Sequence, residues 1–339
     1  MSGRRLPVYL LLDCSESMAG PAIESVSRGV SSLLAALRQS PHALESVYLS
    51  VIQFSKDARQ TVPLTEVAEV QLPTFRVRPG TALGAALSLL LERLSSEVVR
   101  TTVDRRGDYR PLVFLLTDGQ PTDDWQPHAA QLKSMKAPRV ANFYAIGCGP
   151  DVDYEVLHEI SDIVLQMDDL SPEAFEKFFV WLTASVQSAS AGLTDTASDM
   201  KVDLDNLPDG VLAKTPDHTP QRLATPRQVF LHALCSRNRK PYLMRFSWNE
   251  EIERYVAVAS HPLDEAEPDD MQGLPAVNSS LILGCPPCPY CDSSRAGVCA
   301  CGAVFCDGGD GRDSVICPKC HSRLTYGGQQ DFDITQSAG

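Results

Sequence analysis

The sequence predicts an α/β fold with a doubly wound, mostly parallel sheet over residues 1–190, followed by a small β-rich domain. In the first part, apolar runs of strand length alternate with amphipathic stretches of helical period. Several of these runs are apolar throughout, as is typical of strands buried on both faces of a sheet. Eight of the eleven cysteines lie between Cys285 and Cys320, which sets the second part apart.

Strands of the first part are expected where apolar residues run together, and helices where they recur every three or four positions. The expected strands lie at 8–12, 47–54, 112–116 and 140–146, with a short edge strand that contains Pro63 at 61–64. The expected helices lie at 23–37, 81–94 and 172–188. Ser171 stands before the last helix and is its expected N-cap.

The composition changes after residue 190. Ser, Thr, Asp and Pro replace the helical periodicity at 191–226, so we expect a linker there. A small domain at 227–325 is expected to begin with strands at 228–234, 242–248 and 254–259 and to end with the cysteine cluster. Residues 326–339 are polar, and we expect a flexible tail.

The charge and hydropathy of the chain exclude some classes of function. Its 339 residues carry 30 basic and 43 acidic side chains, a formal net charge of −13, so its long-range field opposes nucleic-acid binding. The first apolar run ends at Asp13 with no signal-peptide cleavage site, and no stretch approaches the roughly 20 apolar residues of a membrane span. We therefore expect a cytoplasmic protein without membrane attachment.

Oxygen-bearing side chains follow several of the predicted segments at the edge where the carboxyl ends of parallel strands meet. They are Asp13, Ser15, Ser17, Thr81 and Asp118. Carboxylates and hydroxyls without thiol or imidazole suit Mg²⁺ or Mn²⁺, and an ion so held can take an acidic side chain of a partner protein as its last ligand. These motifs contain no general base, so we expect binding and not catalysis. Alternatively, the three hydroxyls only cap the first and second helices.

The Asp-x-Ser-x-Ser spacing of Asp13–Ser17, together with Thr81 and Thr117-Asp118-Gly119, resembles the metal-ion-dependent adhesion site of von Willebrand factor A domains. The resemblance covers residues 5–190. It implies that Asp13, Ser15 and Ser17 are ligands from the first loop, that Thr81 is the ligand from the second, and that Asp118 acts through water. Glu16 stands where many members of the family have Gly, so an extra carboxylate lies near the site.

The clustered thiols indicate zinc, because four thiolates close a tetrahedral structural site and eight can close two. The Cys-Pro-x-Cys pairs indicate a zinc ribbon, in which the first ion is assigned to Cys288, Cys291, Cys317 and Cys320. The second ion is then assigned to Cys285, Cys299, Cys301 and Cys306. Spacing alone does not fix the pairing, so a swapped set or a ligand from His321 stays open.

An adhesion-type domain followed by such a ribbon is similar to the tellurium-resistance TerY-like proteins of bacteria. That resemblance implies a non-enzymatic scaffold of a stress-response or phage-defence system, associated with a Ser/Thr kinase and a PP2C-type phosphatase. The alternative function is a nucleic-acid-binding zinc-ribbon protein whose N-terminal domain recruits partners. It rests on basic residues of the middle segment, such as Arg239 and Lys240, and on their aromatic neighbours Tyr242, Phe246 and Trp248.

Overall fold

The chain forms two compact units whose main boundary falls between residues 221 and 222. Most of the predicted linker and of the predicted tail, as well as Gly119 of the third loop, lie outside the residues that the structure describes. This computed structural model describes residues 4–102, 106–118, 120–135, 138, 140–149, 152–191, 207–215, 228–264, 276–308, 314–325 and 333–334.

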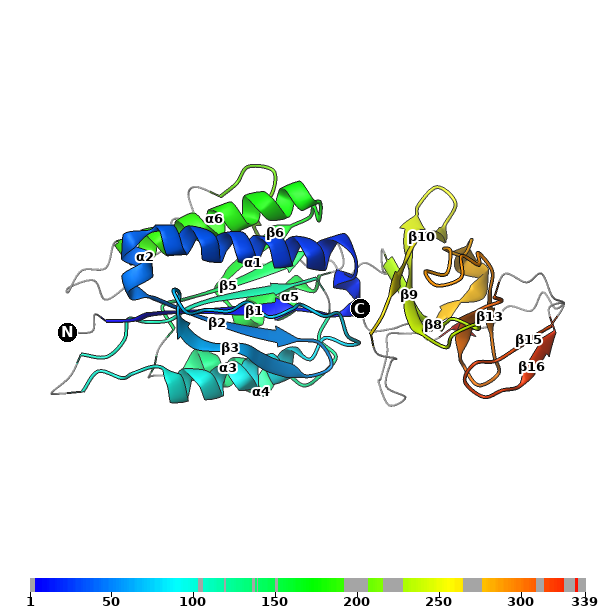
Figure 1. The fold of residues 1–339 in the computed structure, drawn as a ribbon, viewed down its shortest axis with the longest axis horizontal. Helices are drawn as coiled ribbons and strands as arrows, with labels where there is room; N and C mark the ends of the chain where they lie inside the picture. The colour runs from blue at the N-terminus through cyan, green and yellow to red at the C-terminus, as the bar shows by residue number, and fades with distance from the viewer. Residues whose placement is uncertain are drawn as a thin grey trace. The chain divides into compact units, whose positions relative to one another are not determined.

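The first unit is built on one seven-stranded sheet in the order β3-β2-β1-β4-β5-β6-β7 (Figure 1). The central strands β1, β2, β4, β5 and β6 are parallel, and β3 and β7 add antiparallel edges, which confirms the predicted doubly wound sheet. The strands are β1 (Leu6–Asp13), β2 (Val47–Phe54), β3 (Ala58–Glu66), β4 (Leu112–Thr117), β5 (Asn142–Cys148), β6 (Ile163–Met167) and β7 (Ala213–Lys214).

The strand order reverses beside β1. Strand β1 pairs in parallel with β2 on one side and with β4 on the other. Strands β2 and β3 therefore lie on one side of β1, and the later strands β4 to β7 lie on the other. In an open α/β sheet, the crevice at such a reversal lies outside the carboxyl ends of the two strands and is the usual place for a ligand. Here the loops after Asp13 and Thr117 border that crevice.

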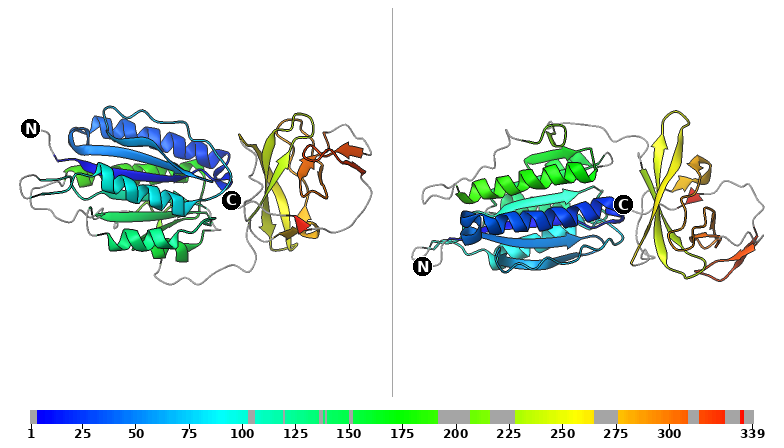
Figure 2. Two further views of the ribbon diagram at one scale, coloured as in Figure 1. Left: turned by 90° about the horizontal axis from the view of Figure 1, so that it is seen from below. Right: turned by 45° about the horizontal axis from the view of Figure 1, so that its top comes forward.

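Helices cover both faces of this sheet. The helices α1 (Pro21–Gln39), α2 (Pro41–Ser46) and α6 (Pro172–Ala191) lie on one face, with α1 and α6 side by side (Figures 1 and 2). The other face is covered by α3 (Leu83–Glu97), α4 (Gln126–Ser134) and α5 (Tyr154–Ile160). The predicted cap of α6 is confirmed, since the Ala174 N–H donates to Ser171 Oγ at 3.2 Å. No helix in the described part of the chain is long and apolar enough to cross a membrane.

Sequence periodicity missed the shortest elements of this unit. Helices α2, α4 and α5 have between six and nine residues, too few for an apolar stripe to stand out from loop composition. Strand β6 was missed as well, and so was the 3₁₀ turn η1 (Glu16–Met18), which the division into units groups with the second unit. The predicted strand at 140–146 lies two residues too early, because β5 is Asn142–Cys148.

The second unit is rich in β-structure. Its longest strands β8 (Gln228–Leu234), β9 (Pro241–Asn249) and β10 (Arg254–Pro262) form the antiparallel meander that the sequence predicts. Strands β12 (Ile282–Leu283), β14 (Val304–Cys306) and β13 (Ala296–Val298) extend it to the order β12-β10-β9-β8-β14-β13. The remaining elements are β11 (Val277–Asn278) with β17 (Asp333–Ile334), β15 (Ser314–Ile316) with β16 (Arg323–Thr325), and the 3₁₀ turn η2 (Ser279–Leu281).

One strand pairing of this unit joins the cysteine-rich region to the meander. Strand β14 lies parallel to β8, with Val304 opposite Ala233 and Phe305 opposite Leu234. Continued by one residue, this register puts Cys306 beside Cys235, which are both fully buried. The cysteine-rich segment and the three long strands therefore share one core, which also contains Val229, Tyr242 and Phe246.

The close packing of α1 on α6 predicts the effect of one substitution. A Cβ added at Gly29 would lie 1.9 Å from Cδ2 of Phe179, so we expect Gly29→Ala to force the helices apart and to lower the free energy of unfolding by about 1–3 kcal/mol. Urea denaturation measures this change. Ser32→Ala, at an exposed position of the same helix, is the matched control and should change stability by less than about 0.5 kcal/mol. Equal stability of the two variants would contradict the packing.

Candidate functional site

Two buried carboxylates lie at the strand reversal. Asp13 is the last residue of β1 and Asp118 follows β4; their exposed fractions are 1% and 7%. Leu12 is opposite Leu116 in the β1–β4 register, so Asp13 lies beside Thr117, whose hydroxyl donates to Asp13 Oδ2. Carboxylates are costly to bury unless donors or a cation compensate their charge, so this edge of the sheet suits a cation.

The negative charge at this edge of the sheet affects the pKa of the Cys148 thiol. Cys148 ends β5, the strand next to β4, and its side chain is fully buried. Burial raises the pKa of the thiol, and the negative charges of Asp118 and Asp13 raise it further. Cys148 is therefore a neutral core thiol, and the charges of both carboxylates raise its pKa.

The first loop brings two hydroxyls together. Ser15 Oγ and Ser17 Oγ are 2.9 Å apart, and Ser15 is fully buried. This separation fits a hydrogen bond, and it also fits two neighbouring ligands of an octahedral Mg²⁺ ion, because metal–oxygen bonds of about 2.1 Å put adjacent ligand atoms about 3 Å apart. The loop therefore holds the two oxygens at the spacing that the predicted ion requires.

Other residues occupy the N-cap positions of the helices that follow these hydroxyls. Gly20 is the N-cap of α1, and Ser15, at the N-cap of η1, makes no capping hydrogen bond through its side chain. Ala82, and not Thr81, is the N-cap of α3. The N-cap positions of α1 and α3 are thus occupied by other residues, which does not favour the alternative in which the three hydroxyls only cap helices.

The second and third loops are bound to each other by hydrogen bonds. The Thr81 N–H donates to Thr122 Oγ1 at 3.1 Å, and the Thr122 N–H donates to the Thr81 carbonyl at 2.9 Å. The Asp123 carboxylate accepts from the N–H groups of Gly84 and Ala85, both at 2.8 Å, and so caps α3 from the neighbouring loop. The sequence did not reveal this cap, because Asp123 stands far from the helix in the chain.

Glu16 connects the first loop to the second. Its Oε2 accepts from the Gly80 N–H at 3.1 Å, and the side chain is buried. The carboxylate that departs from the family pattern therefore has a structural use. It fixes the backbone just before Thr81, so all three loops of the candidate site are tied to one another.

The thiols form two groups that differ from the predicted pairing. In each group the four Sγ atoms lie within 4.8 Å of one another. The inner cluster consists of Cys235, Cys288, Cys291 and Cys306. The outer cluster consists of Cys299, Cys301, Cys317 and Cys320. The predicted set of Cys288, Cys291, Cys317 and Cys320 is thus divided between the two groups.

The β8–β14 pairing is the physical reason for this correction. It puts Cys235, which lies outside the cysteine-rich segment, beside Cys306 despite the seventy residues between them. The predicted ligand Cys285 belongs to neither group; its Sγ lies 4.0 Å from Sδ of Met244, and burial raises the pKa of this thiol to about 11. His321, which was left open as a ligand, is also outside both groups.

The distances within each group fit zinc. Tetrahedral zinc with bonds of about 2.3 Å separates its sulfur ligands by about 3.8 Å, whereas a disulfide brings them to about 2.0 Å. The measured Sγ–Sγ distances are 3.5 Å for Cys291–Cys306, 3.4 Å for Cys299–Cys320 and 3.7 Å for Cys301–Cys317. Four thiols at these distances have the spacing of a tetrahedral site and could hold a thiophilic ion.

One backbone turn recurs in both clusters. In it, the N–H of a cysteine donates to the carbonyl five residues later, and its own carbonyl accepts from the N–H four residues later. The turn begins at Cys235, Cys288 and Cys317, with N···O distances of 2.8–3.0 Å. The fifth residue of each turn, Arg239, Asp292 or His321, has φ of 61°, 60° or 63°. In the first turn Asn238 occupies the place of the second cysteine, so no Cys-x-x-Cys spacing identifies it.

The alternative function in nucleic-acid binding depends on exposed aromatic side chains in the middle segment. Tyr242 and Phe246 are 0% and 2% exposed and belong to the core of the second unit, while Trp248 is half-buried against Tyr255. Arg239 and Lys240 are exposed at the β8–β9 turn. Since bases stack on exposed rings, the buried aromatic side chains do not favour this alternative.

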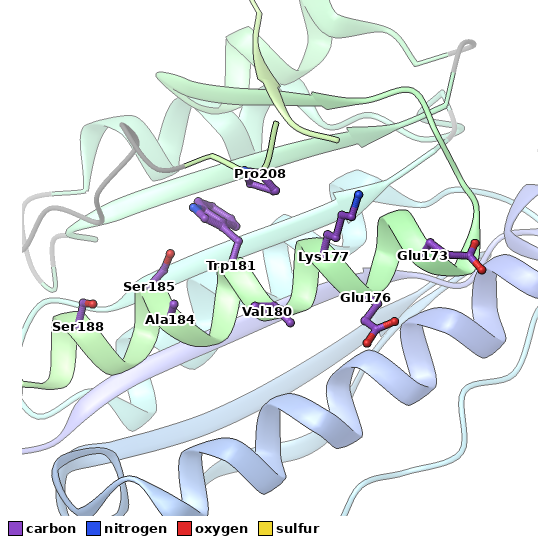
Figure 3. Close-up of a pocket in the computed structure, with 9 residues that line it drawn as sticks. All are labelled: Glu173, Glu176, Lys177, Val180, Trp181, Ala184, Ser185, Ser188 and Pro208. Atoms are coloured by element: carbon purple, nitrogen blue, oxygen red, sulfur yellow. The ribbon is translucent and has the colours of Figure 1, made fainter. Parts of the chain in front are cut away.

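A pocket of about 660 Å³ lies along α6 and was not indicated by the sequence (Figure 3). Trp181 and Lys177 point from the helix toward Pro208, while Val180, 64% exposed, lines the pocket as well. None of the candidate metal ligands lines it. The pocket is therefore separate from both types of candidate metal site.

Comparison with known families identifies both parts of the chain. The model of the von Willebrand factor type A domain matches residues 8–174. The model of the TerY-C metal binding domain matches residues 226–339. No curated protein matches the chain in sequence.

Solved structures resemble about half of the chain. Proximal thread matrix protein 1 from the mussel byssus, with a zinc-occupied MIDAS motif, is 19% identical over 54% of this chain and 48% of its own, with a TM-score of 0.41. The pilus adhesin SpaC from Lactobacillus rhamnosus GG is 16% identical over 55% and 30%, with a TM-score of 0.43. A von Willebrand factor type A protein from Catenulispora acidiphila is 17% identical over 54% and 43%, with a TM-score of 0.40. The match spans less than half the length of each.

The cap from Asp123 predicts a local effect on the second and third loops. We expect Asp123→Ala to leave the N–H groups of Gly84 and Ala85 without their acceptor and to lower the free energy of unfolding by about 1–2 kcal/mol, measured by thermal or urea denaturation. Asp124→Ala, at the exposed neighbouring position, is the control. If both variants lose the same stability, the cap is not what stabilises this loop.

The regrouped thiols predict which cysteine binds metal. We expect Cys235→Ser to bind one zinc ion fewer per chain than the wild type, because the inner cluster loses a ligand. Cys285→Ser should keep the full zinc content, since its thiol lies outside both clusters. Metal analysis of the purified proteins measures both. The opposite result would restore the pairing that spacing suggested.

Proposed function

Since the chain combines a von Willebrand factor type A domain with a TerY-C metal binding domain, we propose that it is a non-enzymatic, metal-dependent scaffold that binds a partner protein. The observation that carries the proposal is the pair of buried carboxylates, Asp13 and Asp118, at the strand reversal beside β1. In this proposal Asp13, Ser15, Ser17 and Thr81 hold Mg²⁺ or Mn²⁺, and Asp118 holds it through water.

The ligand chemistry supports binding of an acidic partner. Most of the proposed direct ligands are hydroxyls, which carry no charge, so the ion keeps much of its positive charge. A carboxylate from another protein then gains a charge-assisted contact when it fills the open coordination position. The proposed partner surface therefore presents an Asp or Glu side chain.

We further propose that both thiol clusters hold structural Zn²⁺. The four thiolates of a cluster fill a tetrahedral shell and leave no open position for substrate or water, which favours a structural over a catalytic role. Backbone donors support such a charge, since the Ser236 N–H donates to Cys306 Sγ at 3.3 Å and the Cys320 N–H to Cys317 Sγ at 3.5 Å. The zinc would contribute much of the folding free energy of the loops that it joins.

The resemblance to the tellurium-resistance TerY-like family suggests the biological setting. On that ground we propose a cytoplasmic role in a bacterial stress-response or phage-defence system. A Ser/Thr kinase and a PP2C-type phosphatase are the proposed partners. The match to the TerY-C domain supports the kinship on which this setting rests.

The proposal predicts one hard-cation site that can be removed without loss of zinc. We expect wild-type protein to bind one Mn²⁺ ion, which Mg²⁺ displaces, and Asp13→Ala and Asp118→Ala to abolish that binding, because each removes an anionic ligand or its water contact. Electron paramagnetic resonance of free Mn²⁺ measures the binding, and zinc content is the control for folding. Unchanged Mn²⁺ affinity in both variants would end the proposal.

The same variants test partner binding. Capture from native cells should require Mg²⁺ or Mn²⁺ and should disappear in Asp118→Ala. The metal-free capture experiment should omit Mg²⁺ and Mn²⁺ and not use EDTA, because EDTA would also remove zinc from the thiol clusters. Asp124→Ala is the control, because it also removes a carboxylate from this loop but not a proposed ligand. This variant should capture the partner as the wild type does.

A further inference from the structure

The outer cluster connects two turns that belong to different sheets of the second unit. Cys299 and Cys301 lie between β13 and β14, which are strands of the six-stranded sheet. Cys317 and Cys320 lie between β15 and β16, which pair only with each other among the described residues. Sγ of Cys299 is 3.4 Å from Sγ of Cys320, in the other turn. Sγ of Cys301 is likewise 3.7 Å from Sγ of Cys317, so a metal held by these thiols would link the two sheets.

The β15–β16 hairpin has only a small apolar contact with the larger sheet. Val315 and Leu324 of the hairpin are partly buried and pack against the small core around Phe305 of β14. Ile316, also in the hairpin, is 55% exposed. Because a two-stranded hairpin is only marginally stable by itself in water, its attachment depends strongly on a metal at the outer cluster.

One cysteine on each side of the outer cluster is exposed. Cys301, in the turn of the larger sheet, and Cys320, in the turn of the hairpin, are both exposed, whereas Cys299 and Cys317 are buried. A competing ligand replaces a metal-bound sulfur only where it can approach, and an apolar shell around a metal site limits that approach. The outer cluster lacks such a shell at two of its four thiols, so a competing ligand can approach a metal there from either turn.

The inner cluster has the opposite surroundings. Cys235 and Cys306 are fully buried and Cys288 is 2% exposed, while Cys291 is partly buried. These thiols lie in or against the apolar core that the three long strands share with β14. A competing ligand reaches most of them only after this core opens, and a core opens far more rarely than an exposed turn.

We propose that the outer cluster is an exchangeable metal site, from which a competing thiol or chelating ligand takes zinc while the inner cluster keeps its ion. In each step a donor atom of the competing ligand bonds to zinc as one zinc–sulfur bond breaks, and the freed thiolate takes a proton from the solvent. Loss of the ion detaches the β15–β16 hairpin and leaves the six-stranded sheet in place. The hairpin thus responds to the supply of thiophilic metal. The inference rests on the proposed occupancy of both clusters by zinc.

Zinc transfer from the full-length chain to a chromogenic pyridylazo chelator tests this proposal. We expect two phases of equal amplitude, the first at least about tenfold faster than the second, because only the inner ion waits for a core to open. Cys301→Ser should remove the fast phase and Cys235→Ser the slow phase, since each variant removes a ligand of one cluster. Cys285→Ser is the matched control and should keep both phases, because its thiol lies outside both clusters.

Hydrogen–deuterium exchange of the wild type locates the structural change. After transfer of the first ion, amide exchange should become faster at 314–325 and stay unchanged at 228–262. A single rate for both ions, loss of the fast phase in Cys235→Ser instead of Cys301→Ser, or unchanged exchange at 314–325 would overturn the proposal. Equal zinc content of Cys301→Ser and the wild type would instead refute metal binding by the outer cluster itself, on which the proposal rests.

Discussion

The parallel pairing of β1 with both β2 and β4 is the constraint on which the candidate adhesion site depends. Because the sheet reverses its order there, the loops after two neighbouring strands diverge and leave a crevice between them. Asp13 and Asp118 occupy the strand ends that border it. The hydrogen bonds of Thr122, Asp123 and Glu16 then restrict the loops that carry the hydroxyls, so the arrangement is held before any ion arrives.

The second unit uses strand pairing in a comparable way. The β8–β14 contact brings one cysteine of the meander to three of the cysteine-rich segment, and those thiols lie within the apolar core. The outer cluster differs, since Cys301 and Cys320 are exposed and only a small group of apolar residues around Phe305 packs against it. Burial thus distinguishes two sites that have the same four-thiol composition.

Much of the fold followed from the sequence because its main elements have strong local signals. The fully apolar β1 and β4 and the striped α1 identify a doubly wound sheet, and the order of the loops then leads to Asp13, Ser15, Ser17, Thr81 and Asp118. The thiol pairing did not follow, because Cys235 reaches the inner cluster through a contact between distant strands and lacks a second cysteine in its turn. Asp123 was missed for the same reason: its partners belong to another loop. Local sequence patterns identified cysteine as the ligand type, but the pairing of strands that are distant in sequence determined which cysteines lie together.

The turn that begins at Cys235, Cys288 and Cys317 makes each of these stretches a self-contained unit. Its two backbone hydrogen bonds and its left-handed fifth residue shape six consecutive residues without help from the rest of the chain. The stretch at Cys235 has this geometry with one thiol, whereas the stretches at Cys288 and Cys317 have it with two. The same turn thus supplies three of the four thiols of the inner cluster with only one further cysteine, Cys306, coming from a strand, and it supplies two thiols of the outer cluster.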